Sequence, residues 1–261
     1  MLDYPFTVDE GFIRNELYRA LDSGLPTINT VLQENRGGID YATGVALMSF
    51  AEWVCAAWAL EEHEAMARFQ AAITDLTQLM FNRFTTTEIQ HKTLVVDLTL
   101  YALGQSRDTF EHIALNTHGR SHTPPPQYDQ IPGYNYHLTD AVTALIAGND
   151  EQARHSSRLA YDDLADPSTP PDVYLDGIPH AIHAIIDHDN QALAQAAQYT
   201  TNLYVQARTP TKDYRAGAYD LVYLELTMLS RIAIWRGMTP PTNPFIIQLD
   251  KNNNTTLPPL N

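Results

Sequence analysis

Apolar positions recur with a helical period along most of this chain. Residues 7–10 have the spacing of a capping box and precede an amphipathic segment that we expect to end at Gly24. Pro26 then opens a short second helix, which the glycine pair at positions 37 and 38 is expected to end. Residues 41–60 form the longest apolar run, and they predict a helix that is buried on most of its faces.

The helical period continues beyond this apolar run. We expect an amphipathic helix at residues 63–84 that pairs antiparallel with the buried one, and further helices at residues 94–104 and 107–117. The last long helix is expected at residues 214–235, where the apolar face is too wide for a surface helix, and Gly237 is expected to end it. Because no alternating run bounded by hairpin turns occurs in the sequence, we predict an all-α chain without strands.

Residues 139–200 contain one helical-hairpin pattern written twice. A shift of forty residues places residues 144–151 over residues 184–191, and each copy has an apolar helix, a polar break and a second helix rich in Ala and Gln. The breaks contain residue types that adopt a left-handed helix end or cap the next helix through a side-chain oxygen. The pattern predicts about ten helices in stacked antiparallel αα-hairpins, arranged as a helical-repeat-like array or bundle.

Prolines mark the clearest interruption of the helical pattern, at residues 119–136. Consecutive prolines exclude helix, and Tyr128, Tyr134 and Tyr136 favour a long ordered surface loop over a free linker. We therefore expect a single α-helical domain at residues 1–250, with possible halves at 1–118 and 137–238 joined by this loop. The polar tail at residues 251–261 is expected to be disordered.

The composition favours a globular protein of a reducing, cytoplasmic compartment. The chain has 261 residues, of which 44% are hydrophobic, and its one cysteine, Cys55, excludes an intramolecular disulfide. Acidic residues near the N-terminus are unlike a secretory signal. Glu52 near the centre of the apolar run, and the lack of a flanking basic cluster, argue against a membrane-spanning helix.

The charge favours a basic partner. Acidic residues outnumber basic residues by 31 to 16, and the formal net charge is −15, which disfavours nucleic acid as a ligand and attracts basic surfaces. Solubility alone is the alternative explanation of this charge. Five aspartates line the predicted loop edge between the two hairpins, and we consider this acidic edge a candidate partner-binding site rather than only a solvated helix end: Asp162, Asp163, Asp166, Asp172 and Asp176.

A histidine cluster in the second hairpin is the strongest candidate for chemistry. His180 and His183 share a helix face, and the pair His188-Asp189 resembles the metal-binding pair of histidine-aspartate phosphohydrolases. That family also needs an upstream histidine and a downstream aspartate on separate helices, and capping of the break explains His188-Asp189 without a metal. A metal-dependent hydrolase that uses His180, His183, His188 and Asp189 is therefore kept only as an alternative.

Other signatures of enzymes are missing from the sequence. It contains no Gly-rich phosphate loop, no nucleophile elbow and no paired His-Glu motif of zinc proteases. Cys55 is expected to be an unreactive core thiol, because it lies within the apolar run. We expect neither an enzyme nor a cofactor or metal.

Three segments carry a resemblance to a known family: residues 144–150 (ALIAGND), residues 184–193 (AIIDHDNQAL) and residues 229–237 (LSRIAIWRG). With them, the C-terminal half resembles the immunity protein 49 family of bacterial polymorphic-toxin systems. The resemblance implies a non-enzymatic antidote that binds a cognate toxin domain, with contact residues that vary with the toxin. The alternative from another class is a helical-repeat adaptor for some other protein, which predicts a concave groove.

Overall fold

The computed structural model describes residues 4–33, 39–83, 95–104, 106–117, 133–166, 175–208 and 216–248. Helices are the only regular secondary structure in these ranges, which confirms the predicted all-α class. The elements are α1 (Glu10–Arg19), the π-helical turn η1 (Ala20–Gly24), α2 (Leu25–Gln33), α3 (Ile39–Ala59), α4 (His63–Arg83), α6 (Val95–Tyr101), α7 (Arg107–Thr117), α8 (Gly133–Ile146), α9 (Asp150–Ala165), α10 (Ile178–Ile186), α11 (Asn190–Arg208), the 3₁₀ turn η4 (Ala218–Leu221) and α12 (Leu224–Trp235).

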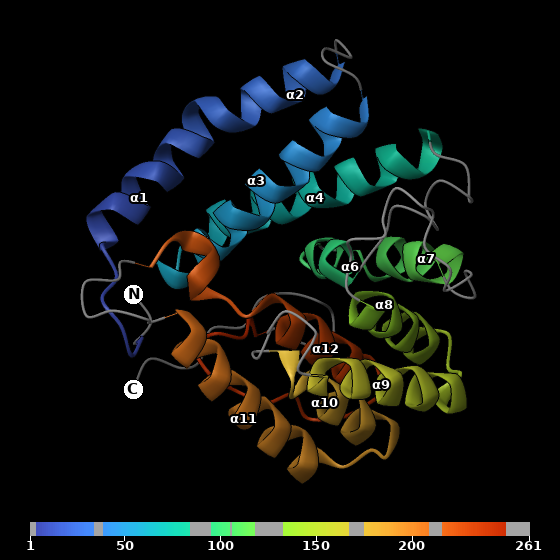
Figure 1. Cartoon of the computed structure of the whole chain (residues 1–261). Helices are drawn as coiled ribbons and strands as arrows, with labels where there is room; N and C mark the ends of the chain where they lie inside the picture. The colour runs from blue at the N-terminus through green and yellow to red at the C-terminus, as the bar shows by residue number, and fades with distance from the viewer. Residues whose placement is uncertain are drawn as a thin grey trace.

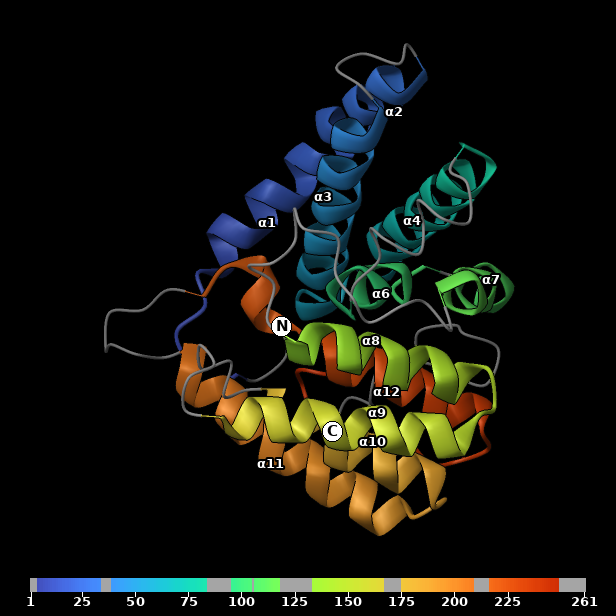
Figure 2. The same ribbon diagram turned by 45° about the vertical axis from the view of Figure 1, so that its right-hand side comes forward.

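The helices form two groups with a shorter pair between them. Figures 1 and 2 show α1 to α4 on one side of the molecule, α8 to α12 on the other, and α6 and α7 between the two groups. The contacts agree, because α6 packs against α3, α4, α8 and α12, while α7 packs against α4 and α8. Buried side chains from Ile13 in α1 to Ile247 near the C-terminus form one contiguous hydrophobic cluster.

The predicted buried helix is α3, and α4 packs along it after a tight turn. Cys55 in α3 has no exposed surface, and burial raises the pKa of its thiol. Within the described ranges, no helix is both long enough and apolar enough to cross a membrane.

The prediction that Gly24 ends the first helix is wrong. The chain passes from α1 through η1 into α2, and the N–H of Leu25 donates to the C=O of Ala20 across the π-helical turn. A Cβ atom at position 24 would lie 2.7 Å from Cη2 of Trp53 in α3, which is closer than packed carbon atoms tolerate. Gly24 therefore permits close packing on α3 instead of terminating a helix.

The Pro-rich interruption ends earlier than predicted. Helix α8 begins at Gly133, and both Tyr134 and Tyr136 are buried on it, so their assignment to a surface loop is wrong. The physical reason is that Tyr134 belongs to the apolar face that continues through Leu138 into the core. Tyr128 lies outside the described residues.

The prediction of one helix over residues 214–235 is also wrong. Val222 and Tyr223 are extended, and they separate η4 from α12. The N–H of Tyr223 donates to the C=O of Phe245 over 2.7 Å, so a hydrogen bond to a distant segment replaces the helical one. Phe245 is buried in the same hydrophobic core as residues 221–223. The apolar side chains of this run therefore belong to an extended core segment and not to a helix face.

Two arginines connect α12 to the rest of the fold. Arg231 is buried, its Nη1 donates to the C=O of Gly104 over 2.6 Å, and burial lowers its pKa to about 9. Nη2 of Arg236 donates to the C=O of Leu145 over 2.6 Å and contacts Oδ1 of Asp150 at 2.7 Å. Helix α12 is thereby joined to the α6–α7 connection on one side and to the α8–α9 corner on the other.

Candidate functional site

The two predicted hairpins are α8–α9 and α10–α11, and their corners share one hydrogen-bond pattern. In the first corner the N–H of Asn149 donates to the C=O of Ala144 over 2.9 Å. Forty residues later the N–H of Asp189 donates to the C=O of Ala184, again over 2.9 Å. This bond, from a residue to the fifth residue before it, is typical of the Schellman motif that ends many helices. The repeat predicted from the sequence is therefore confirmed in the backbone of both corners.

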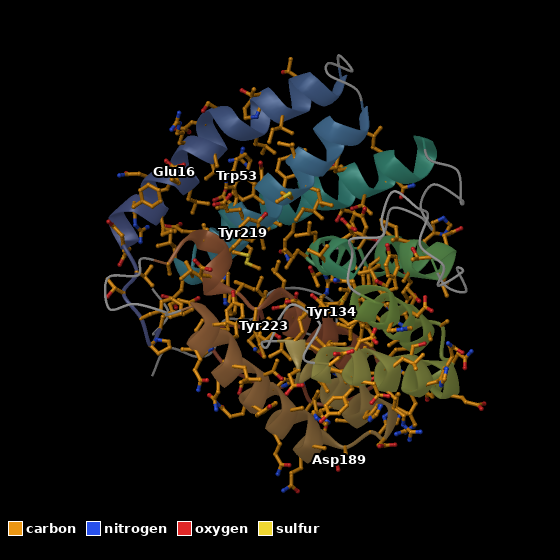
Figure 3. The ribbon with its side chains drawn as sticks, in the orientation of Figure 1. Glu16, Trp53, Tyr134, Asp189, Tyr219 and Tyr223 are labelled. Atoms are coloured by element: carbon orange, nitrogen blue, oxygen red, sulfur yellow. The ribbon has the colours of Figure 1, made fainter. Side chains whose placement is uncertain are left out.

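The side chains at the two corners differ. The left-handed position is Gly148 in the first corner, with φ of 75°, and His188 in the second, with φ of 52°. Oδ1 of Asn149 accepts one N–H bond of α9, whereas Oδ1 of Asp189 accepts the N–H groups of both Gln191 and Ala192 over 2.9 Å. Figure 3 shows Asp189 at the outer end of α10 and α11, far from the α1–α4 group.

A groove of about 530 Å³ runs along the junction of α10 and α11, and we call it the α10–α11 seam. Three small side chains, Ala184, Ala192 and Ala196, line its more buried part. Because the two helices are antiparallel, His180 and Tyr199 lie at one end of the seam, and Asp187 and Asp189 lie at the other (Figure 1). The seam therefore combines an apolar floor with an aromatic end and a carboxylate end.

Three rings extend the aromatic end of the seam across α9, α10 and α11. The rings of Tyr161 and His180 meet edge to face, with centroids 5.4 Å apart. The hydroxyl group of Tyr199 donates to Oδ2 of Asp176 over 2.8 Å. Tyr161 and Tyr199 remain 40% and 46% exposed, so each presents part of its ring to solvent. We call Tyr161, His180 and Tyr199 the tyrosine row.

The aspartates of the predicted acidic edge flank this row without converging on one point. Asp162 and Asp166 are exposed at the C-terminal end of α9. Asp163 faces α8, where its Oδ2 lies 3.6 Å from Nε2 of His137, and Asp176 accepts the bond from Tyr199. Asp172 lies outside the described residues. The four described aspartates of the acidic edge therefore do not line one common pocket.

The four residues of the alternative metal site have separate structural roles. His180 packs on Tyr161, His188 occupies the left-handed corner, and Asp189 caps α11. His183 is half-buried in the seam, and burial holds its pKa below the usual value. In the part of the chain that the structure describes, no three His, Cys, Asp or Glu side chains are arranged to hold a metal ion.

An ion pair separates the seam from a second groove. Nη2 of Arg154 in α9 contacts Oδ1 of Asp187 at 2.5 Å, and this bond is the main cause of the lowered pKa of Asp187. On the far side of the pair, a larger groove of about 700 Å³ is lined by residues that include Arg154, His155 and Arg158. Asp150 and Glu151 line this second groove as well, so it contains side chains of both charges.

Known proteins give no further assignment of this site. No protein-family model matches the chain, and neither the curated proteins nor the solved structures include a significant match. The resemblance to the immunity protein 49 family stays a prediction, and the site is interpreted from its own geometry.

Neither tyrosine of the row was predicted from the sequence as a candidate site residue. Tyr161 and Tyr199 each lie in the second, polar helix of a hairpin, where Ala and Gln predominate. A large aromatic side chain on the solvent side of such a helix is a signal that could have found them. The apolar floor of the seam could not be predicted from one segment either, because its alanines come from both α10 and α11.

Proposed function

We propose that this chain is an immunity protein, which binds a cognate, basic toxin domain and neutralises it by direct contact. The observation that carries the proposal is the exposed tyrosine row with aspartates on both sides of it. Tyrosine rings bury a large area at low entropic cost and are enriched in binding hot spots. The carboxylates around them favour a partner of opposite charge.

The charge of the whole chain supports the same class of partner. A net charge of −15 raises the rate of encounter with a basic protein and makes that rate sensitive to salt. A toxin that cleaves nucleic acid has a basic cleft for phosphate groups, and an acidic inhibitor could occupy such a cleft. The proposal assigns no catalytic role to any residue of this chain.

Co-expression tests the proposal directly. The chain is produced together with the toxin domain encoded beside it, and cell survival and co-purification are measured at low and high ionic strength. We expect survival and a complex that weakens as salt rises, because the aspartates around the tyrosine row remain in solvent. Cell death despite normal expression of the folded chain would contradict the proposal and favour the helical-repeat adaptor.

A matched pair of variants locates the contact. Tyr199→Ser removes a row tyrosine that is 46% exposed, and Tyr18→Ser removes a tyrosine of α1 that is 47% exposed. Each tyrosine also has a charged residue beside it, Asp176 for Tyr199 and Arg14 for Tyr18. A hot-spot tyrosine contributes about 2 kcal/mol, so we expect Tyr199→Ser to weaken the complex roughly thirtyfold and Tyr18→Ser to leave it unchanged. Equal losses in the two variants would move the interface away from the row.

A further inference from the structure

A groove of about 440 Å³ lies among α2, α3 and α4, and we call it the α4 groove. Phe50 of α3 is buried beneath it, while Leu25 of α2 and Leu79 of α4 are only partly buried and line it. Figures 1 and 2 show α4 in the group of helices opposite α10 and α11. The α4 groove is therefore separate from the α10–α11 seam and from the tyrosine row.

The residues that α4 contributes to this groove lie mostly along one helix face. They recur at helical spacing, and we call them the α4 stripe: Arg68, Ala71, Ala72, Asp75 and Leu79. Arg68 and Asp75 are both exposed, and they lie about 10 Å apart along the helix axis. Neither side chain has an ion pair or a hydrogen bond in the part of the chain that the structure describes. The stripe thus carries one cation and one anion, with two small side chains between them.

The order of these side chains makes the α4 stripe complementary to itself. Arg68 and Asp75 lie at equal distances on either side of the point between Ala71 and Ala72. In an antiparallel pair of α4 helices centred on that point, Arg68 of each copy faces Asp75 of the other. The alanines at the centre allow the two helices to approach closely. A contact across a two-fold axis requires a patch that complements itself in this way.

The charge of the α4 stripe favours a second copy of the chain over a basic partner. The whole chain carries a net charge of −15, but the stripe contains one charge of each sign. A basic surface would be attracted by Asp75 and repelled by Arg68. A parallel pair of α4 helices would place like charges opposite each other, so the charges also select the antiparallel orientation.

We propose that two copies of this chain associate through their α4 stripes, with the helices antiparallel and the Arg68–Asp75 ion pair formed twice. The same register places Leu79 against the aliphatic part of Glu64 of the second copy, which is exposed in the first turn of α4. This inference goes beyond the proposed function and does not rest on it, because the tyrosine row lies on the other group of helices. Protection of cells by a chain that stays monomeric would leave the antidote function standing and remove only the dimer.

Sedimentation equilibrium of the purified full chain tests the association. The chain is studied from about 5 µM to about 500 µM, a range that covers weak and moderate affinities. An ionic strength of about 0.15 M shortens the Debye length to about 8 Å and screens the repulsion between two acidic copies. We expect a reversible equilibrium between monomer and dimer. A monomer over the whole range would overturn the proposal.

Reversal of either charge identifies the interface. Arg68→Asp places an aspartate opposite Asp75 twice in each dimer, and Asp75→Arg places an arginine opposite Arg68 twice. We expect each variant alone to dimerise at least about tenfold more weakly than the unaltered chain. A mixture of the two variants should form a heterodimer, because every facing pair then joins an arginine to an aspartate. Circular dichroism verifies the helix content of both variants, and folded variants that stay monomeric when mixed would overturn the pairing.

The matched control reverses a charge outside the α4 groove. Arg158→Asp changes the net charge by the same amount as Arg68→Asp, at an exposed arginine of α9. We expect Arg158→Asp to dimerise as the unaltered chain does. Equal weakening by Arg158→Asp and Arg68→Asp would attribute the effect to net charge and would overturn the α4 interface.

Discussion

The α8–α9 and α10–α11 hairpins have the same backbone and different surfaces. Their corners use the same hydrogen bonds at positions forty residues apart. Yet the α9 groove is lined by two arginines together with Asp150 and Glu151, whereas the α10–α11 seam is lined by two aspartates, two histidines and Tyr199, without an arginine. The turn residues and the buried apolar residues determine the backbone of each hairpin. The exposed residues can therefore differ between the two hairpins, and they determine what each surface can bind.

Each hairpin begins with a glycine, and the largest expected change in unfolding free energy comes from the glycine of the second hairpin, Gly177. A Cβ atom at Gly177 would overlap Oγ1 of Thr200 and lie 2.9 Å from its Cβ, and Thr200 is buried and cannot move aside. We therefore expect Gly177→Ala to cost about 1–3 kcal/mol of unfolding free energy through overpacking. Denaturant titration measures this cost.

The control for this change is Gly133→Ala in the other hairpin. Its Cβ would lie 2.5 Å from Oδ2 of Asp163, which is the end of a partly exposed carboxylate that can rotate away. We expect a change within about 0.5 kcal/mol. Equal losses at the two glycines would show that the hairpins do not differ in packing here.

Substitutions at the left-handed position of each corner should change the stability of the fold in opposite directions. Gly148→Ala places a side chain at φ of 75°, with no atom within 4 Å, so only the backbone conformation is strained and about 1 kcal/mol should be lost. His188→Gly relieves a non-glycine residue at φ of 52° and should gain up to about 1 kcal/mol. Thermal unfolding of both variants checks the pair, and losses in both would contradict it.

His183 in α10 has Thr143 as its equivalent in α8, so only the second hairpin has a titratable group at this position. We expect it to give the stability of the fold a small dependence on pH. The pKa of His183 is lowered below its usual value of 6.5 by burial first, so the unfolded chain binds the proton more readily. Stability should fall as the pH drops from 6.5 toward the folded-state pKa, and His183→Thr should remove this part of the acid sensitivity. Melting temperatures across this range, compared with those of the unaltered chain, give the result; parallel curves would refute the role of His183.

The smallest effect is expected from the ion pair between the hairpins. Arg154→Gln removes the bond that lowers the pKa of Asp187, and solvent screens this pair because both side chains are partly exposed. The stability lost should be small above the usual aspartate pKa of 3.8, and it should disappear as the pH falls through the lowered folded-state pKa. Acid titration of both proteins measures this, and a difference that persists at the lowest pH would require another cause.

Local signals explain which parts of the fold could be predicted. The forty-residue repeat and the helix at residues 107–117 follow from turn residues and apolar spacing within each segment. The errors at Gly24 and Val222 have a different origin, because each depends on a residue far away in sequence. Trp53 requires a glycine at position 24, and the Phe245 segment supplies the hydrogen bond that ends the helical backbone near Val222.

The candidate site was predictable only in part for the same reason. The positions of the acidic edge were proposed from residue types, and Asp162 lies near the C-terminal end of α9 while Asp176 lies just before α10. The tyrosine row requires three helices to be placed side by side, so no single segment contains its signal.

Because Cys55 is buried, the rate at which a reagent labels its thiol reports how often the centre of the molecule opens. As the single thiol, without exposed surface and with a raised pKa, it reacts with a thiol reagent only after α3 has separated from its neighbours. At high reagent concentration the labelling rate equals the opening rate of the molecular centre, and at low concentration it reports the opening equilibrium. A bound partner reduces that equilibrium by the factor 1 + [L]/Kd, so labelling of Cys55 would measure the affinity of a partner docked more than one helical layer away.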